Sequence, residues 1–546
     1  MNNAFVIIGL LIVSLSIWFA SSAKQTAKTL PKQIHLILFF LTIIGLLVSR
    51  LWQLDTLPSG LNQDEAAIGY DAWALAQFGI DRNGYPFPVL PMSWGSGAGG
   101  FIIYLGAIVF QFVPLTVTSL RFMNGVIQVI TALVFYDLIK RKTNPTYGLI
   151  ALVFIVINPW HVMLSRWNLD ANQVFSLIII GLWLFEIGMS KNQKRYHFLA
   201  LTFFALALYS YGSAMVVVPL LLLMIYGHSW FHKSMTFKTI LVYGSYFLIL
   251  SMPILTFYII NLFELESILT PLFSILRFNV LRSQSVFISF DQDVWIRIWN
   301  NLKDLTQLLT FGKDDYLWNQ LPGFGIAYLY LFPFFIVGFI VNRKSKIHVS
   351  MYAWFVSGVV LSLILNQNIN RLGVLFIPYL YFLVLGLIWL AQRSSKLFSL
   401  VSSVIFTSAV LFTIQYQVVY REQIKPIFAY GYGEALQFSQ TLSKSEWRLP
   451  SQQQVNGSHV IALFYLQPDP NDVVATGVYL NPGAEFQYLA SFQADEIFYR
   501  FYQPSGMVTV ESDIGYIIHQ QLENFFILED YEVERFGYFT VIWINA

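Results

Sequence analysis

The segment LGVLFIPYLYFLVLGLIWL, residues 372–390, decides the fold class. It contains no charged side chain, and its length is close to the roughly 20 apolar residues that one membrane-spanning helix requires. Comparable apolar segments recur along the 546-residue chain, so the sequence predicts about twelve transmembrane helices. They are expected at 4–20, 35–50, 116–139, 146–160, 172–189, 197–210, 213–227, 239–261, 325–341, 349–365, 372–390 and 398–416.

The composition agrees with an α-helical polytopic membrane protein. Charged residues make up 11% of the chain and hydrophobic residues 56%, whereas an ordinary soluble domain carries roughly 25% charge. Soluble, disordered and collagen-like classes are therefore excluded. The chain has no cysteine, which excludes disulfides, thiolate nucleophiles and cysteine-based metal sites.

The loop charges predict the orientation in the membrane. One set of loops carries sixteen Lys and Arg residues and no Asp or Glu: Lys24, Lys28, Lys32, Lys140, Arg141, Lys142, Lys191, Lys194, Arg195, Lys233, Lys238, Arg343, Lys344, Lys346, Arg393 and Lys396. Such loops face the cytoplasm. Both termini then lie outside, and the first helix, which lacks a basic leader, is expected to be retained.

Three regions are predicted along the chain. Residues 1–34 form an extra N-terminal transmembrane helix with a basic inner loop, and 35–416 form the main transmembrane domain with a first outer loop at 51–115. Residues 417–546 change in character, with 15 acidic and 6 basic side chains from Arg421 onward. Their pattern predicts a small extracytoplasmic α/β domain, with strands at 459–465, 507–511 and 538–544 and helices at 433–442 and 514–525.

The first outer loop contains the most informative motif, GLNQDEAAIGYDAW at 60–73. Asp64 and Glu65 open a helical pattern beside the membrane, where the helix dipole favours negative charge. An ionised Asp64 there can accept a proton from a hydroxyl nucleophile. The alternative is an ordinary helix N-cap.

The remainder of this loop supplies further candidates. Tyr70, Asp71 and Arg82 are candidate substrate-binding residues, and Phe101–Phe112 is expected to lie along the membrane interface. The glycine-rich stretch 95–100, which follows Trp94, has no preceding strand. It therefore indicates a flexible turn rather than a nucleotide-binding loop.

The loop with Asp-Glu after the leading helix, followed by two interfacial helices, resembles the GT-C superfamily of polyprenyl-phosphate-dependent glycosyltransferases over residues 35–390. It is most similar to family 39, which contains protein O-mannosyltransferases and the lipid A aminoarabinose transferase. The resemblance implies a polyprenyl-phosphate sugar donor and an acceptor hydroxyl. The chain lacks the Lys-Pro-Pro motif of the aminoarabinose transferase and the β-trefoil of the mannosyltransferases, so a glycan or glycolipid acceptor is favoured over a protein.

Two other outer-face clusters carry polar candidates. His161, Arg166 and Asp170 lie in the turn at 158–170, where the resemblance makes Asp170 a second acidic site residue; the alternative is a Pro-terminated helix with interface anchors. Asn370 and Arg371 interrupt two apolar helices. Arg371 is suited to bind phosphate through paired hydrogen bonds, and the alternative is a snorkelling helix cap.

These residues suggest an inverting glycosyl transfer at the outer face of a bacterial cell membrane. Asp64 is the expected base, Glu65 and Asp170 orient the reactants, and Arg371, with Arg166 or Arg82, stabilises the leaving phosphate. No metal site or nucleic-acid partner is indicated, although the resemblance leaves a divalent cation open. The alternatives are a lipid-linked glycan polymerase or ligase, and a flippase, which would carry ionisable groups near helix midpoints.

Overall fold

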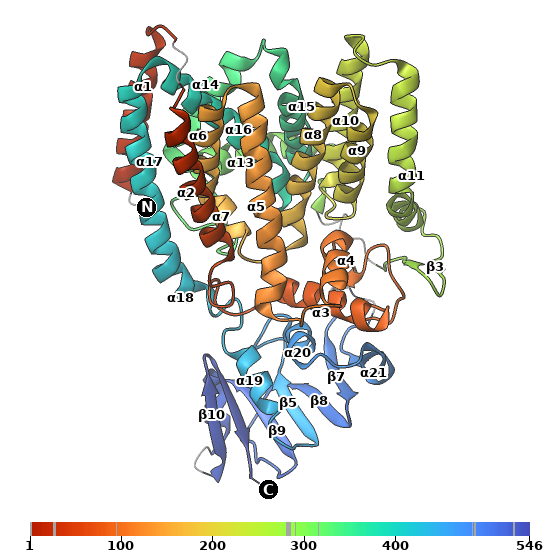
Figure 1. Cartoon of the computed structure of the whole chain (residues 1–546). Coiled ribbons are helices and arrows are strands. Elements are labelled where there is room, and N and C mark those ends of the chain that lie inside the picture. Colours follow the sequence, from red (N-terminus) through yellow and green to blue (C-terminus); the bar gives the residue numbers. More distant parts are fainter. Residues whose placement is uncertain are drawn as a thin grey trace.

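The fold is a bundle of helices with a sheet domain at one end (Figure 1). The computed structural model describes residues 3–25, 29–93, 96–279, 286–289, 291–314, 316–482, 484, 487–527 and 530–545. Lys28, Trp94 and Gly95 lie outside the described residues.

Nine helices in the described part of the chain are long and apolar enough to span a membrane, counting the irregular turns that extend three of them. They are α1 (Asn3–Ser21), α2 (Lys32–Leu51), α5 (Val117–Lys142), α8 (Val174–Lys191), α10 (Ala214–Phe231), α11 (Phe237–Leu262), α15 (Val349–Ile364), α16 (Ile369–Arg393) and α17 (Ser395–Gln415). Each coincides with a predicted segment, which confirms the polytopic helical class. The extending turns are η1 (Asp170–Gln173), η3 (Lys346–His348), and η4 (Tyr416–Tyr420) with α18 (Arg421–Ile424).

The other three predicted spans form shorter helices: α6 (Pro145–Val156), α9 (Lys194–Leu208) and α14 (Phe332–Asn342). α6 ends before Asn158, whose side chain caps the short α7 (Pro159–Leu164). The expected helix at 325–341 is wrong at its beginning, because the chain enters the bundle as turns and η2 (Leu329–Leu331). Its backbone is satisfied by protein: Asn158 Nδ2 donates to the Ile326 carbonyl at 3.0 Å. Irregular backbone is tolerated at such depth only with partners of this kind.

Two helices of the first outer loop lie at the end of the bundle that faces the sheet domain, α3 (Gln63–Phe78) and α4 (Gly100–Val109) (Figure 1). α3 begins with a capping box, in which the Asn62 side chain accepts the Asp64 N–H and Glu65 reaches back to the Asn62 N–H. The two predicted loop helices are therefore confirmed. The long outer loop supplies α13 (Val294–Phe311), which packs against α15. Two short hairpins complete these loops: β1 (Met92–Ser93) with β2 (Ser96–Gly97), and β3 (Ile268–Leu269) with β4 (Ser274–Ile275).

The sheet domain has seven strands in the order β10-β11-β9-β5-β8-β7-β6. β5 lies in the middle, parallel to β8 and β9, and the other pairs are antiparallel. The strands are β5 (Glu446–Pro450), β6 (Val478–Tyr479), β7 (Leu489–Ala494), β8 (Ile497–Tyr502), β9 (Ile514–His519), β10 (Glu532–Phe536) and β11 (Phe539–Trp543). The helices are α19 (Tyr432–Ser439), α20 (Ser458–Leu466) and α21 (Pro470–Thr476), with η5 (Gln520–Phe525) after β9.

The α/β character and two predicted elements are confirmed, namely the helix near 433–442 and the strand near 538–544. Three predictions are wrong. Residues 459–465 form helix α20, which packs against α3, and 514–519 form β9. Residues 507–511 form no strand. Short apolar runs do not distinguish a buried helix from a buried strand, and α20 and β9 are both of this kind.

Candidate active site

Residues from four distant parts of the chain line one cavity at the ends of the helices that face the sheet domain, with an empty volume of about 630 Å³. We call it the reaction cavity. Its polar lining includes Asp64, Asp170, Tyr211, Asn368, Asn370 and Arg371. Four of the predicted site residues, Asp64, Asp170, Asn370 and Arg371, are therefore brought together.

Asp64 reaches the cavity from the first turn of α3. Its N–H donates to Asn62 Oδ1 at 2.8 Å, which fixes the backbone, while the carboxylate is partly exposed. The N-terminal end of α3 favours the negative charge of this side chain. The position suits a base that must meet a substrate.

Asp170 is held by the glycine-rich stretch. The Gly99 N–H donates to Asp170 Oδ2 at 2.9 Å, and Ser210 Oγ donates to the Asp170 carbonyl at 2.9 Å. A Cβ at Gly99 would lie 1.9 Å from the Ser210 carbonyl oxygen, so only glycine permits this approach. The expected flexible turn is in fact bound to Asp170 at Gly99.

Arg371 lies in the first turn of α16, which Asn368 caps by accepting the Arg371 N–H at 2.8 Å. Arg371 Nη1 donates to the Asn366 carbonyl at 2.8 Å. A guanidinium has five N–H donors, so others remain for a phosphate. Arg371 is the one cationic side chain among the described residues that line the reaction cavity.

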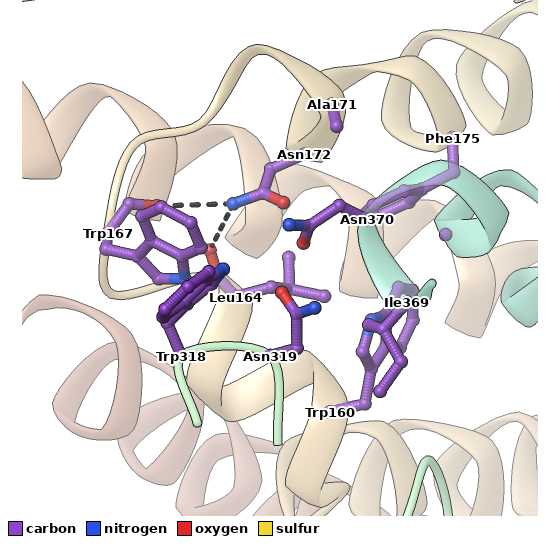
Figure 2. Close-up of a pocket in the computed structure, with 11 residues that line it drawn as sticks. Trp160, Leu164, Trp167, Ala171, Asn172, Phe175, Trp318, Asn319, Ile369 and Asn370 are labelled. Atoms are coloured by element: carbon purple, nitrogen blue, oxygen red, sulfur yellow. Dashed lines mark hydrogen bonds between the residues drawn. The ribbon is translucent and has the colours of Figure 1, made fainter. Parts of the chain in front are cut away.

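Three further cavities meet the reaction cavity at 366–371. The apolar cavity, of about 1070 Å³, shares Asp170 and Arg371 with it and is otherwise lined mainly by apolar and aromatic side chains, including Leu208, Met215, Phe257, Tyr258, Phe278, Leu361 and Leu365. The aromatic cavity, of about 280 Å³, shares Asn370 and lies among Trp160, Trp167 and Trp318 (Figure 2). The polar cavity, of about 690 Å³, shares Asn368.

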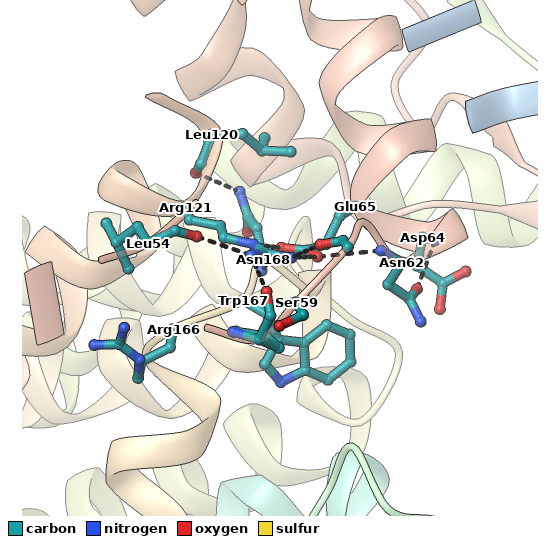
Figure 3. Close-up of polar contacts among 12 residues, drawn as sticks. Leu54, Ser59, Asn62, Asp64, Glu65, Leu120, Arg121, Arg166, Trp167 and Asn168 are labelled. Carbon is teal, nitrogen blue, oxygen red and sulfur yellow. Dashed lines mark hydrogen bonds and ion pairs between the residues drawn. The ribbon is translucent and has the colours of Figure 1, made fainter. Parts of the chain in front are cut away.

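Glu65 points into protein rather than into the reaction cavity. Its two oxygens accept from Arg121 Nε at 2.9 Å and Nη2 at 2.8 Å, and both side chains are fully buried (Figure 3). The Asn168 N–H donates to Glu65 Oε1 at 2.8 Å. Arg121 also donates to the carbonyls of Leu54, Pro58 and Gly60. This Glu65–Arg121 cluster fixes the first loop, and the orienting role expected for Glu65 stays a prediction.

The comparisons with known proteins agree with this architecture. The family described as dolichyl-phosphate-mannose-protein mannosyltransferase matches residues 98–257. ArnT from Cupriavidus metallidurans, crystallised with undecaprenyl phosphate, has 11% identity and a TM-score of 0.53, covering 94% of this chain and 98% of that protein. The Archaeoglobus fulgidus oligosaccharyltransferase has 13% identity and a TM-score of 0.43, covering 88% and 62%. No curated protein matches the sequence.

The chain has a GT-C fold. It resembles the family 39 glycosyltransferases within that superfamily, as the first outer loop predicts. The reaction cavity thus lies in a fold whose similar members are membrane glycosyltransferases.

Arg166 and His161 do not line the reaction cavity of this GT-C domain. Arg166 donates to four backbone carbonyls at the end of α2 and just after it, those of Ser49, Trp52, Gln53 and Leu57. His161 is fully buried, with its Nδ1 2.8 Å from Arg50 Nη2. Both side chains hold the end of α2, and their expected contacts with substrate stay a prediction.

Three further candidates contact other parts of the protein: Tyr70, Asp71 and Arg82. The Tyr70 hydroxyl donates to the Pro468 carbonyl at 2.9 Å, which joins α3 to the sheet domain. Asp71 and Arg82 form a buried ion pair at 3.0 Å. Arg82 Nη2 donates to Ser93 Oγ at 3.1 Å, and Ser93 lines the reaction cavity. Arg82 therefore reaches the edge of the reaction cavity through Ser93, and the substrate contacts expected for these three residues stay a prediction.

Arg121 and Gly99 support the site through Glu65 and Asp170, although neither is among the residues that the sequence predicts for it. Arg121 carries a charge within a predicted span, and such a residue marks a buried partner or a functional site. Within the described residues, no three or more His, Asp or Glu side chains gather as a metal site. Asp64 and Asp170 could supply two carboxylates to Mg²⁺, which commonly completes its shell with substrate phosphate and water oxygens.

Proposed function

We propose that this protein transfers a sugar, with inversion, from a polyprenyl-phosphate donor to an acceptor hydroxyl. One observation carries the proposal: a carboxylate, Asp64, and a guanidinium, Arg371, line a cavity that continues into an apolar cavity. Because Arg371 and Asp170 line both cavities, the phosphate of a lipid-linked sugar can lie at this junction with its tail on the apolar side.

The proposed reaction is a single displacement. Asp64 accepts the proton of the acceptor hydroxyl, and the oxygen forms a bond to the anomeric carbon through an oxocarbenium-like transition state. The bond from that carbon to the phosphate oxygen breaks, and its electron pair leaves with the phosphate. Arg371 and the N-terminus of α16 stabilise the added negative charge.

The apolar cavity suits a polyprenyl chain. Its lining comes from the turn at 208–213 and from α10, α11 and α15, with Phe278, Val286 and Phe287 of the long outer loop. ArnT, which has the same fold, was crystallised with undecaprenyl phosphate. We assign the lipid portion of the donor to this cavity.

We further propose that the site faces the outside of a bacterial cell membrane. The basic ends of helices, such as the last turn of α5 with Lys140, Arg141 and Lys142, lie at the opposite end of the helices from the reaction cavity. The positive-inside rule places that basic end in the cytoplasm. The sheet domain then lies outside, with α3 between it and the bundle (Figure 1).

Asp64→Asn tests the proposal. We expect transfer from undecaprenyl-phosphate sugars, supplied as a panel to purified protein, to fall by roughly 10²–10⁴-fold, the usual contribution of a general base. Protection of the protein against heat by undecaprenyl phosphate should remain. Asp55→Asn is the matched control, because Asp55 is an exposed carboxylate outside the reaction cavity. Sugar transfer at the wild-type rate by Asp64→Asn would refute the role of Asp64 as the base.

The same panel separates the alternatives. A polymerase or ligase would require diphosphate-linked oligosaccharides, and a flippase would form no glycosidic bond. Adding EDTA and then Mg²⁺ shows whether Asp64 and Asp170 work with a divalent cation. A cation requirement would assign these two carboxylates to metal binding instead of proton transfer.

A further inference from the structure

We infer that the polar cavity binds a neutral glycan as acceptor, and that the glycan's terminal hydroxyl reaches Asp64 past Asn368. The inference rests on the proposed function and names its acceptor. Its basis is the position of the polar cavity, its chemistry, and buried amide oxygens that have no partner.

The position of the polar cavity would keep the acceptor apart from the lipid tail of the donor. The polar cavity lies beside the C-terminal half of α13, and its lining includes Lys313, Asp314, Tyr316 and Gln367. It shares Asn368 with the reaction cavity. It shares no lining residue with the apolar cavity. A donor tail and an acceptor can therefore approach Asp64 from different directions, as a displacement with inversion requires.

The chemistry of the lining suits hydroxyl groups. Seven of the eight described side chains that line it are polar: Asp304, Gln307, Lys313, Asp314, Tyr316, Gln367 and Asn368. Among these described residues, Lys313 is the one cation and is outnumbered by two carboxylates. A phosphorylated or otherwise acidic acceptor would be repelled, whereas a neutral sugar can exchange hydrogen bonds with these amides and carboxylates.

An aromatic pair extends this surface. The rings of Tyr316 and Trp318 stack with centroids 4.8 Å apart and planes at 28°. Tyr316 lines the polar cavity and Trp318 the aromatic cavity. Large amphipathic rings of this kind offer apolar faces with polar edges, which matches the alternating C–H and hydroxyl surfaces of a sugar.

Two buried amide oxygens on this surface lack a hydrogen-bond donor, Asn319 Oδ1 and Gln367 Oε1. Their amide nitrogens are engaged, because Asn319 Nδ2 donates to the Asp314 carboxylate at 3.2 Å and Gln367 Nε2 donates to the Ser362 carbonyl at 2.8 Å. Turning either amide over would place its oxygen against the Asp314 carboxylate or the Ser362 carbonyl, and both of these groups only accept hydrogen bonds. An unpaired buried acceptor is unfavourable, so these two covered oxygens would gain from a sugar hydroxyl once a small side-chain shift exposes them to the cavity.

The experiment compares two variants and a control. Tyr316→Ala and Gln307→Ala remove lining side chains, and the matched control Trp299→Ala removes an exposed ring of α13 that lies outside the polar cavity. Each is expressed in a strain of the source organism that lacks the wild-type gene, and the sugar added to neutral surface glycan is measured by mass spectrometry. Heat protection of each purified protein by undecaprenyl phosphate reports on the donor site.

We expect at least a fivefold loss of glycan modification in both variants, an unchanged effect of undecaprenyl phosphate, and wild-type behaviour of the control. Normal modification in both variants would overturn the inference. So would transfer of the sugar to protein or to a phosphorylated lipid. Absence of heat protection in the wild-type protein would instead count against the proposed function.

Discussion

Asp64 and Glu65 are neighbours in the first turn of α3, yet they belong to opposite kinds of site. Glu65 is fully buried, and Arg121 and the Asn168 N–H occupy its oxygens. Asp64 turns the other way, toward a cavity that also contains Arg371 (Figure 3). A helix places successive side chains about 100° apart, so one turn can hold a loop with one carboxylate and present the other to substrate.

The two arginines repeat this contrast. Arg121 donates to three carbonyls as well as to Glu65, whereas Arg371 makes one side-chain hydrogen bond, to the Asn366 carbonyl. An arginine whose donors are all used by protein cannot also bind phosphate. The donors of Arg121 are thus used by protein, whereas among the described residues Arg371 keeps donors that the proposed phosphate contact could use.

Breaking the Glu65–Arg121 cluster should have the largest effect. Arg121→Ala leaves a buried carboxylate without its partner, so the free energy of unfolding should fall by about 3–5 kcal/mol. Thermal unfolding in detergent measures the loss. Arg297→Ala is the control, because its ion pair with Asp291 is exposed and such pairs contribute about 0–1 kcal/mol. Equal losses in the two variants would contradict the structural role of Arg121.

Arg371→Ala should weaken the donor without unfolding the protein. Charge-assisted hydrogen bonds are worth about 1.5–3 kcal/mol each, so the affinity for undecaprenyl phosphate should fall roughly 10–100-fold, as measured by thermal shift against ligand concentration. Arg371→Lys keeps the charge but not the forked geometry. Its affinity for undecaprenyl phosphate should lie between those of the wild-type protein and Arg371→Ala. Wild-type affinity in Arg371→Ala would assign the side chain to helix capping.

Gly99→Ala tests how the Asp170 side chain is held in place. The added Cβ would lie 1.9 Å from the Ser210 carbonyl oxygen and 2.6 Å from Asp170 Cβ, so the loop must move away. We expect a loss of stability of about 1–3 kcal/mol, as for other overpacked sites, together with reduced transfer. Gly506→Ala is the control, because no atom lies within 4 Å of its added Cβ.

The effect confined to a range of pH concerns Asp81, beside the Asp71–Arg82 pair. Burial, with the nearby Asp71 charge, raises the pKa of Asp81 to about 7. Its folded pKa exceeds its unfolded value of about 3.9, so its contribution to stability is present below about pH 4 and is lost as pH rises through 7. Asp81→Asn should reduce the slope of the unfolding free energy with pH by at most about 1.4 kcal/mol per pH unit. Parallel pH profiles of the two proteins would contradict this.

Much of the bundle follows from the sequence because lipid imposes a simple rule, that a spanning segment must be apolar and satisfy its own backbone. Residues 372–390 follow this rule and lie within α16. Residues 325–331 do not form an α-helix, and a polar partner of this segment, Asn158, is distant in the sequence. Hydropathy contains no information about such partners.

The site was predictable only in part. Asp64, Asp170, Asn370 and Arg371 line the reaction cavity, whereas Arg166 and His161 lie on the same outer turn as Asp170 and bind the end of α2. Sequence proximity identified the turn, but the direction of each side chain depends on which carbonyls lie nearby. Gly99 appeared to be a turn residue because its hydrogen-bond partner, Asp170, and the nearby Ser210 carbonyl belong to other segments.

The contact between Leu61 and Phe428 has a consequence for biosynthesis. The Leu61 N–H, directly before α3, donates to the Phe428 carbonyl at 2.7 Å, and Gly60 lies so close that a Cβ there would be 2.1 Å from the same oxygen. The ribosome makes these partners more than three hundred residues apart. The loop that carries Asp64 must therefore wait, already inserted at the membrane, until nearly the whole chain has been translated before its final support arrives.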